Sequence, residues 1–540
     1  MRTHGIRRLW FVLIAGIGLV LLTGAAVQVA NSSKSLYAKL RLFSEVLDRI
    51  ENDYVEEKDP QVLVESAIRG MVSSLDPHTN YLSAEQFEKW NQNFEGYSGI
   101  GIYFDVISDK ITIMSIIPGG PSDKAGLLSG DRIVAINGET AVGMKRDDVP
   151  LKLMGPRGTK VDISVERTGW SKPRSYTLVR DEVHIQSVSF AFMIQPEVGY
   201  VQITRFSATT DTELEKALGK LEEQGMNQLI LDLRRNGGGY LEAAVKAADK
   251  FIPGGKRIVY TKGRMPDSFR EFFSTDRATR LSLPIVVLID RASASASEIV
   301  AGSLQDWDRA LIAGETSFGK GLVQSQYRMN DGSALLMTTA HYYTPSGRLI
   351  QRSYSNKSFD NYFNEIMEDS VRAKWEKDPS RPAYKTMVLG RKVLGGGGIT
   401  PDVFLATSVD TLTQTVRRIF FAAQRPFFTF AEAYVRKHPE LEGRDFNTFI
   451  RDPKLNSGIL PQFLAFLKDQ GIAVSSGEYV RSADDIQFLL KQNIATKVWG
   501  DEAGFKVQML RDRELLEAIG KLPLAQALLA KAYRPVNPRK

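Results

Sequence analysis

Three serines at alternate positions follow a short apolar run near the middle of the chain. The run Ile285–Ile289 has the composition of a buried strand, and Ser293, Ser295 and Ser297 follow it, separated only by alanines. A helix that begins there directs its backbone N–H groups at the turn, where they can stabilise a developing oxyanion. The small neighbours leave room for a substrate backbone. The segment therefore fits a nucleophilic serine, although serines that merely cap a helix give the same pattern.

A nucleophilic serine needs a base, and two candidates lie downstream. His341 would complete a Ser-His-Asp arrangement, but we expect it to be a strand residue facing solvent. Lys320 lies between two glycines and can enter a tight site, where desolvation lowers the pKa of an ammonium and frees the amine to accept a proton. The spacing from Gly314 to Lys320 also approaches a phosphate-binding loop, yet Gly321 occupies the position where that loop needs Ser or Thr.

Composition limits the other classes of function. The chain has 540 residues, enough for three or four structural units, with 43% hydrophobic and 25% charged residues, which is typical of a packed globular protein. The net charge of +7 is spread over 70 basic and 63 acidic residues, so nucleic acid is not an expected partner. The absence of cysteine excludes disulfides, cysteine zinc sites and thiol nucleophiles. None of the five histidines is spaced like a metal pair, and we expect neither a metal nor another cofactor.

The first 31 residues have the pattern of a secretory signal or a membrane anchor. Arg2, Arg7 and Arg8 precede an uncharged run, Leu9–Ala30, which is about long enough to cross a bilayer as a helix. Basic residues before the span predict a cytoplasmic N-terminus, so the rest of the chain would face the periplasm from the inner membrane. Gly24–Ala26 offers a cleavage site, and cleavage would release the protein into the periplasm.

The pattern of apolar residues and glycines changes three times along the remaining chain, which predicts a multidomain α+β protein. Helical apolar spacing predicts an N-terminal helical region, residues 32–95, and glycine-punctuated short strands predict a β-rich domain, residues 96–181. Alternating strands and helices over residues 182–408 predict a layered α/β core. Helical spacing returns in residues 409–540, an extension that either mediates oligomerisation or docks an adaptor, or else packs on the core as support.

The β-rich domain carries a peptide-binding signature. Gly99, Ile100, Gly101 and Ile102 form a loop whose backbone N–H groups can capture a carboxylate, beside a strand edge that an incoming peptide can extend. The loop is followed by Ala-Gly-Leu and by Gly-Asp-Arg-Ile-Val-Ala-Ile-Asn-Gly, which ends in a strong hairpin turn. This combination closely resembles a PDZ domain, and the resemblance implies an extended peptide ligand with a free C-terminal carboxylate.

Six ordered motifs between about residues 40 and 405 resemble the carboxyl-terminal processing (tail-specific) serine proteases. They are Leu-Asp-Pro-His-Thr-Asn-Tyr-Leu from Leu75, Asp-Leu-Arg-Arg-Asn-Gly-Gly-Gly from Asp232, Ser-Ala-Ser-Ala-Ser-Glu from Ser293, Gly-Glu-Thr-Ser-Phe-Gly-Lys-Gly from Gly314, Tyr-Tyr-Thr-Pro-Ser-Gly-Arg from Tyr342 and Gly-Ile-Thr-Pro-Asp from Gly398. The resemblance implies a crotonase-like or Clp-like protease core. It also implies a membrane-anchored or periplasmic endopeptidase that cleaves proteins at or near their C-termini.

The same resemblance assigns roles to residues. It makes Ser295 the nucleophile, Lys320 the general base and Gln324, expected one helical turn further on, the residue that orients the lysine. The oxyanion hole would use the N–H of Ala296 and one from the Gly237–Gly239 loop, with Gly238 as the candidate. Ser293 and Ser297 become turn and capping residues, and Glu298 and Asp306 are as consistent with a structural ion pair or cap as with catalysis.

Two other functions remain open from the sequence. One is a catalytically silent scaffold that recruits partners through the PDZ domain and the helical extension, although the intact Ser295, Lys320 and Gln324 argue against it. The other is a Ser-His-Asp hydrolase that uses His341.

Overall fold

The computed structural model describes residues 36–276, 280–355, 357, 359–405 and 412–533. The expected membrane span at residues 9–30 lies outside this part of the chain. Among the described residues, no helix combines the length and the apolar character that a bilayer crossing requires. The chain divides into two compact units, Met1–Tyr81 and Leu82–Lys540.

The first unit is helical, as the sequence predicts. Residues 36–53 form one helix, and Pro60–Ser73 (α2) forms the next. Asp59 caps α2 by accepting a hydrogen bond of 2.8 Å from the N–H of Gln61, and Pro60 occupies the first turn, where its missing N–H costs nothing. A short strand, Asn80–Leu82 (β1), follows at the boundary of the two units.

The β-rich segment forms an antiparallel sheet in the order β3-β4-β5-β7-β8, with β6 paired to β5. Asn137 and Gly138 both have positive φ, 50° and 82°, as the two-residue hairpin between β5 and β6 requires. Alternate isoleucines and valines of these strands form the buried core. The elements are Ala84–Glu95 (α3), Tyr97–Gly99 (β2), Ile102–Ile107 (β3), Lys110–Ile116 (β4), Pro121–Lys124 (α4), Arg132–Ile136 (β5), Glu139–Thr140 (β6), Val149–Leu153 (α5), Lys160–Glu166 (β7), Arg174–Val179 (β8) and Asp181–Val183 (β9).

A mostly parallel sheet in the order β10-β11-β12-β15-β16-β21 forms the α/β core. Its central strands are buried on both faces, which is why they read as unbroken apolar runs. Val287 and its alternate neighbours pack on the helices α6, α7 and α8, whereas Val286 and Leu288 face the opposite side. The elements are Val188–Gln195 (β10), Val198–Ile203 (β11), Thr210–Glu223 (α6), Gln228–Asp232 (β12), Leu241–Asp249 (α7), Ile285–Ile289 (β15), Ala296–Asp306 (α8), Leu311–Gly314 (β16) and Val403–Phe404 (β21).

A second sheet contains four antiparallel strands, β13, β14, β17 and β18. Strand β17 pairs with β18, β18 with β13, and β13 with β14. Two short helices and a small hairpin of β19 and β20 follow β18. The elements are Arg257–Gly263 (β13), Arg270–Phe273 (β14), Leu322–Arg328 (β17), Ala334–Tyr343 (β18), Phe359–Asn364 (α9), Asp369–Glu376 (α10), Ala383–Lys385 (β19) and Lys392–Leu394 (β20).

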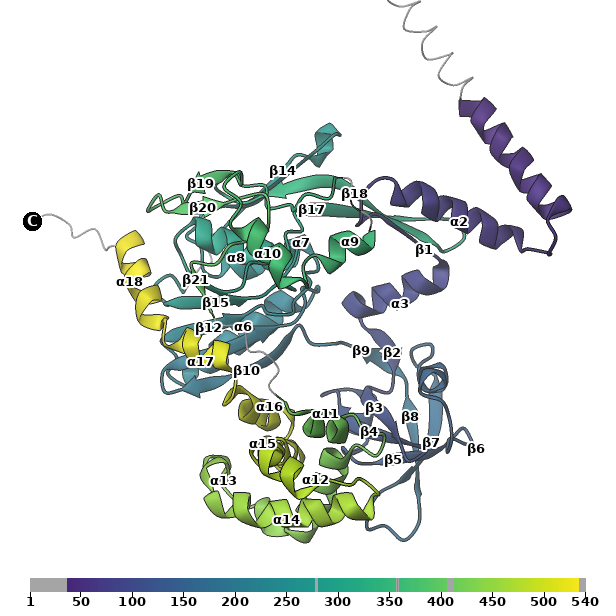
Figure 1. The fold of residues 1–540 in the computed structure, drawn as a ribbon, viewed down its shortest axis with the longest axis vertical. Coiled ribbons are helices and arrows are strands. Elements are labelled where there is room, and N and C mark those ends of the chain that lie inside the picture. The colour runs from purple at the N-terminus through teal and green to yellow at the C-terminus, as the bar shows by residue number, and fades with distance from the viewer. Residues whose placement is uncertain (1–35, 277–279, 356, 358, 406–411, 534–540) are drawn as a thin grey trace, which may run out of the picture. The chain divides into compact units, whose positions relative to one another are not determined.

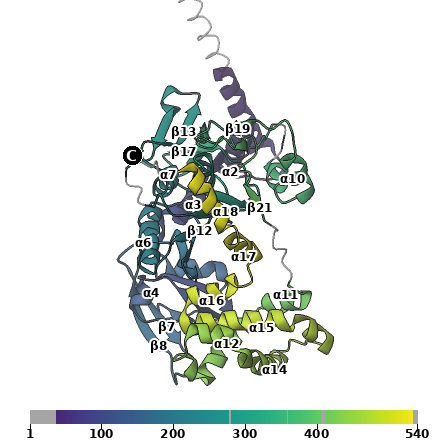
Figure 2. The ribbon, with the colours of Figure 1, turned by 90° about the vertical axis from the view of Figure 1, so that its left-hand side faces the viewer.

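The C-terminal extension consists of two parts with different contacts. Helices α11 to α16 share an aromatic-rich core of their own, and Figure 2 shows α12, α14 and α15 side by side. Helices α17 and α18 instead pack on the sheet face that Val286 and Leu288 present, as Figure 1 also shows. The helices are Gln414–Phe420 (α11), Pro426–Lys437 (α12), Phe446–Arg451 (α13), Pro453–Asp469 (α14), Ser476–Trp499 (α15), Asp501–Met509 (α16), Arg513–Ile519 (α17) and Leu522–Ala532 (α18).

Charged contacts hold both parts of the extension to the preceding domains. The guanidinium of Arg132 in β5 lies 3.0 Å from the Glu432 carboxylate in α12. Arg234, after β12, lies 2.7 Å from Asp512 and 2.8 Å from Glu514, at the start of α17. The sequence left packing and partner docking equally open for this region, and the structure shows that its last two helices pack on the core.

Candidate active site

Ser295 lies at the turn between strand β15 and helix α8. It is the residue before the first turn of α8, and its φ of 56° is in the left-handed region that non-glycine residues rarely adopt. The flanking serines hold this turn: Ser293 Oγ donates to the carbonyl of Leu233, and Ser297 Oγ donates to that of Asn236, each at 2.8 Å. The strained serine therefore stands at a helix N-terminus and is itself only partly buried.

Lys320 and Gln324 meet through their side chains, but no helix places them together. Lys320 Nζ donates to Gln324 Oε1 at 2.6 Å. Gln324 lies in strand β17, so the expectation of a helical turn between the two residues is wrong. The pairing of β17 with β18 shifts between Val323 and Gln324, an irregularity of the kind that re-aims a side chain. The Lys320–Gln324 contact thus forms beside an irregular strand pairing and without helical spacing.

The carboxylate of Glu298, in the first turn of α8, joins the serine turn to the lysine loop. Its Oε2 accepts from the N–H of Ser295 at 2.8 Å and from that of Lys320 at 2.9 Å. Its Oε1 accepts from Ser317 Oγ at 2.5 Å and from the N–H of Gly319 at 2.7 Å. Burial raises the pKa of Glu298 above its ordinary value, while the four donors oppose that shift. Glu298 therefore positions both segments and has no acceptor capacity left over.

Tyr342 makes a second bridge between the same two segments. Its hydroxyl oxygen lies 2.9 Å from the carbonyl oxygen of Ser295 and 2.7 Å from that of Lys320, so its single proton is shared between these two acceptors. The ring is 1% exposed, and burial raises its pKa well above the usual value, so the hydroxyl stays protonated as a donor. Sequence reasoning quoted Tyr342 within a motif but gave it no role. Its place on the inward face of β18 was the available signal.

The Gly237–Gly239 loop lies against the serine turn. A Cβ on Gly238 would come within 2.8 Å of the Ser295 Cβ and 3.0 Å of the Ala296 nitrogen, so only glycine fits this approach. Gly238 also has a φ of 105°. Its own N–H donates to Asn236 Oδ1 at 2.9 Å. The loop and the Ala296 N–H are thus adjacent, as an oxyanion hole needs, while the Gly238 N–H has a side-chain acceptor in this conformation.

His341 lies in strand β18, opposite Leu322 of β17 and Lys262 of β13. It is partly buried rather than facing solvent, and its Nδ1 is shielded. Among the hydrogen bonds of the described residues, none joins His341 to Ser295.

Asp306, at the end of α8, is fully buried in an ion pair with Arg348. The closest approach is 2.6 Å, and neither side chain is exposed. A second carboxylate oxygen accepts from the N–H of Ser346 at 2.9 Å. This matches the structural alternative that the sequence left open for Asp306. Among the described residues, no group of three or more histidine and acidic side chains is placed to hold a metal.

A groove of about 250 Å³ adjoins the predicted carboxylate-binding loop of the β-rich domain. Ile100, Gly101 and Ile102 line it, whereas Gly99 does not, and α5 supplies the opposite wall. Burial raises the pKa of Tyr97, which lines the groove, to about 12. Sequence reasoning missed most of the lining residues outside the loop, because they come from other elements: Lys89 and Gln92 of α3, Phe104 of β3, Pro150 and Leu153 of α5, Met154 just after α5, and Ile185.

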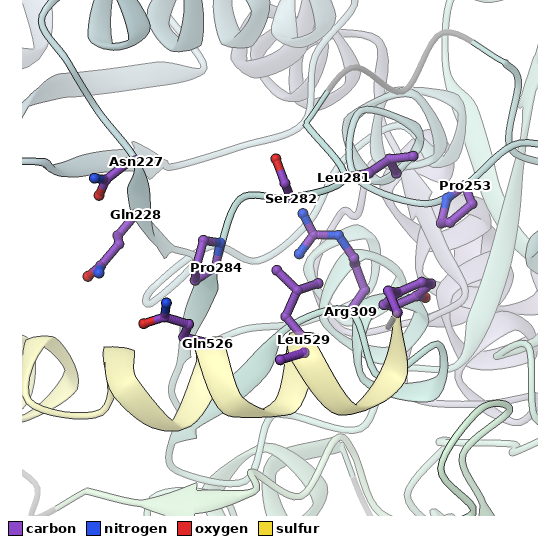
Figure 3. Close-up of a pocket in the computed structure, with 11 residues that line it drawn as sticks. Asn227, Gln228, Pro253, Leu281, Ser282, Pro284, Arg309, Gln526 and Leu529 are labelled. Atoms are coloured by element: carbon purple, nitrogen blue, oxygen red, sulfur yellow. The ribbon is translucent and has the colours of Figure 1, made fainter. Parts of the chain in front are cut away.

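A larger cavity, of about 570 Å³, lies at the opposite end of strand β15 from Ser295. Figure 3 shows it between α18 and the segment that leads into the strand, with Arg309 on its wall. Pro284 lines it, and β15 begins at the next residue. The cavity is therefore separated from Ser295 by the length of the strand.

Comparison with known families matches four parts of the chain. Residues 197–355 match peptidase family S41, and residues 112–167 match the PDZ domain. Residues 23–86 match the N-terminal domain of the activating protease CtpB, and residues 421–500 match a family of unknown function (DUF8443). The last match covers helices α12 to α15 of the C-terminal extension.

Individual proteins match over most of their length. The carboxy-terminal-processing protease of Bartonella bacilliformis is 36% identical over 345 residues, which cover 63% of this chain and 79% of that protein. The carboxy-terminal processing protease CtpA of Bacillus subtilis is 33% identical over 325 residues, covering 60% and 68%. Among solved structures, the photosystem II D1 C-terminal processing protease is 26% identical with a TM-score of 0.35, covering 71% of this chain and 97% of that one.

Proposed function

Because this chain belongs to the carboxy-terminal-processing proteases of peptidase family S41, we propose that Ser295 and Lys320 form its catalytic dyad. The observation that carries the proposal is the double bridge between the two segments. Glu298 accepts from the backbone N–H of both residues, and the Tyr342 hydroxyl lies within hydrogen-bond distance of the carbonyl oxygen of both. A fold has little reason to fix these two loops to each other so rigidly unless their side chains act together.

The chemistry is acyl transfer. Neutral Lys320 Nζ takes the hydroxyl proton while Ser295 Oγ attacks the scissile carbonyl, and the tetrahedral oxyanion faces the Ala296 N–H and the Gly237–Gly239 loop. The protonated lysine then delivers its proton to the leaving amine, so the peptide bond breaks and a Ser295 ester forms. Water hydrolyses the ester with Lys320 as base. Gln324 acts through Lys320 by accepting a hydrogen bond from its Nζ, which orients the amine.

The dyad is tested by proteolysis of an unfolded protein with an apolar C-terminus. We expect Ser295→Ala and Lys320→Ala to lose cleavage, because each removes one half of the proton transfer. His341→Asn, the matched control, should retain wild-type activity. Retained activity in Lys320→Ala, with loss in His341→Asn, would exclude the lysine base.

The PDZ groove is the proposed binding site for the substrate tail. The Ile100–Ile102 loop supports this role through its backbone and its position along the groove. A tail bound there would be an added strand whose carboxylate lies on the loop. We expect amidation of a substrate C-terminus to raise KM at least tenfold with little change in kcat. Equal KM values for the acid and the amide would remove carboxylate recognition from the proposal.

The inner membrane, with the protease facing the periplasm, is the proposed location. The support is the basic flank and apolar run of residues 1–31. After cell fractionation, the full chain should stay with the inner membrane through alkaline washing, and external protease added to spheroplasts should degrade it. Recovery in the cytosolic fraction would contradict this location.

A further inference from the structure

Gln351 contacts the Lys320 loop, residues 315–321, which joins β16 to β17. It lies three residues after Arg348, the last residue of the motif that begins at Tyr342, and the proposed proteolytic chemistry gives it no role. The residue is 7% exposed. A buried side-chain amide is costly unless its polar atoms find partners inside the protein. The partners of Gln351 therefore show what its amide holds in place.

The amide of Gln351 makes three hydrogen bonds that fix its orientation. Its Oε1 accepts from the N–H of Gly321 at 2.9 Å. Its Nε2 donates to the carbonyl of Arg352 at 2.8 Å and to the hydroxyl of Tyr362 at 3.1 Å. A backbone carbonyl can only accept and a backbone N–H can only donate, so the oxygen must face Gly321. Both hydrogens of Nε2 are then in use, and the oxygen is committed to the residue after Lys320.

The two glycines that flank Lys320 allow the backbone of Gln351 and Arg352 to approach the loop. The N–H of Arg352 donates to the carbonyl of Gly319 at 2.9 Å. A Cβ on Gly321 would lie 2.9 Å from the Gln351 nitrogen, and one on Gly319 would lie 3.0 Å from the Arg352 Cβ. Gly319 also has a φ of 87°, which side chains rarely adopt. This close approach brings the Gln351 oxygen within reach of Gly321.

The peptide group between Lys320 and Gly321 is held from both sides. Its carbonyl oxygen lies 2.7 Å from the Tyr342 hydroxyl, and its N–H donates to Gln351 at 2.9 Å. Because a peptide group is planar and this one is trans, the two contacts restrain one rigid plane from opposite edges. The Tyr342 proton is shared with the carbonyl of Ser295, and a glycine backbone rotates more freely than any other. The hydrogen bond to Gln351 is therefore the stronger restraint on this plane.

We propose that Gln351 is a positioning residue for the Ser295–Lys320 dyad, because its Oε1 holds the Lys320–Gly321 peptide plane and thereby the direction of the Lys320 side chain. The inference rests on the proposed dyad and adds a residue outside it. When the plane is free to rotate, the amine leaves the geometry that proton transfer needs, and a displacement of about 1 Å can lower a rate about a hundredfold. Gln351 does not line the groove proposed for the substrate tail. Its loss should therefore lower kcat and leave KM unchanged.

The test compares three full-length variants in steady-state cleavage of a fluorogenic peptide with an apolar C-terminus. Gln351→Leu removes the acceptor, and we expect it to lower kcat at least about tenfold with KM within about twofold of wild type. Gln351→Glu keeps an oxygen facing Gly321 whether or not the carboxyl group is protonated, so it should retain kcat within about threefold. Tyr362→Phe is the matched control, because it removes a hydrogen bond from the same amide and leaves Oε1 on Gly321. It should retain kcat within about twofold.

A merely structural role predicts a different pattern, in which kcat follows the melting temperature of each variant. Equal losses of kcat in Gln351→Leu and Tyr362→Phe would therefore overturn the proposal, as would wild-type kcat in Gln351→Leu or a raised KM with unchanged kcat. Lys320→Ala separates this failure from failure of the dyad. Activity in Lys320→Ala would remove the dyad and the role of Gln351 together, whereas an inactive Lys320→Ala beside a fully active Gln351→Leu would remove only the role of Gln351.

Discussion

Replacing Glu298 by glutamine is the sharpest test of how the Ser295 turn and the Lys320 loop are held together. Both carboxylate oxygens accept two hydrogen bonds, from three backbone N–H groups and the hydroxyl of Ser317. An amide has one acceptor oxygen, so either orientation leaves at least one backbone N–H facing an NH₂ group. Hydrogen bonds to charged groups contribute about 1.5–3 kcal/mol each, and a buried donor left alone adds its desolvation cost. We therefore expect the free energy of unfolding to fall by about 3 kcal/mol or more.

Catalysis should fall as well, because one orientation of the amide releases the backbone of both Ser295 and Lys320. A tenfold loss corresponds to only about 1.4 kcal/mol of the activation barrier, so we expect kcat/KM to fall at least tenfold. Urea denaturation and steady-state cleavage of a fluorogenic peptide measure the two effects.

Glu213→Gln is the matched control. One oxygen of Glu213 accepts from the N–H groups of Ser187 and Val188, at 2.7 and 2.9 Å, and the amide oxygen of glutamine can replace it. That variant should lose about 1 kcal/mol or less and keep its kcat. The reasoning would be refuted if Glu298→Gln retained kcat/KM within about twofold of wild type, or if both variants lost the same stability.

Three further substitutions test other parts of the structure. Gly238→Ala should lower the rate of cleavage at least a hundredfold, because its Cβ would collide with Ser295 and the Ala296 nitrogen. Circular dichroism should show an intact fold, and retained cleavage would show that the loop can move to accommodate the methyl group. Arg234→Met should speed tryptic release of the last two helices and destabilise the protein by about 3–5 kcal/mol, since it leaves Asp512 and Glu514 without their cation; an unchanged digestion pattern would contradict this. Burial lowers the pKa of Lys497 to about 8. Above that pH the folded protein has released this proton while the unfolded chain still binds it. The free energy of unfolding should therefore rise by about 1–3 kcal/mol between pH 8 and pH 10.5. Lys497→Met should flatten that rise, as urea titrations at both pH values can measure.

Local patterns in the sequence were sufficient to predict most of the helices, strands and turns. The unbroken apolar run Ile285–Ile289 and the small residues after it predicted the strand, the turn and the helix around Ser295, because these depend on neighbours within a few positions. The Asn137-Gly138 hairpin followed equally from local φ preferences. Motif order then identified the family and its candidate dyad.

The contacts that hold the site depended on residues far apart in the chain. Gln324 meets Lys320 beside a strand irregularity, which depends on the register of β17 against β18 and leaves no mark on local spacing. Glu298 was compatible with a cap, an ion pair or catalysis until its four donors came together from two loops. Likewise, α17 and α18 read only as amphipathic helices, and the unpaired face of the core sheet decided where they pack. Periodicity reports which face of an element is buried, whereas the partner of that face is chosen by the whole fold.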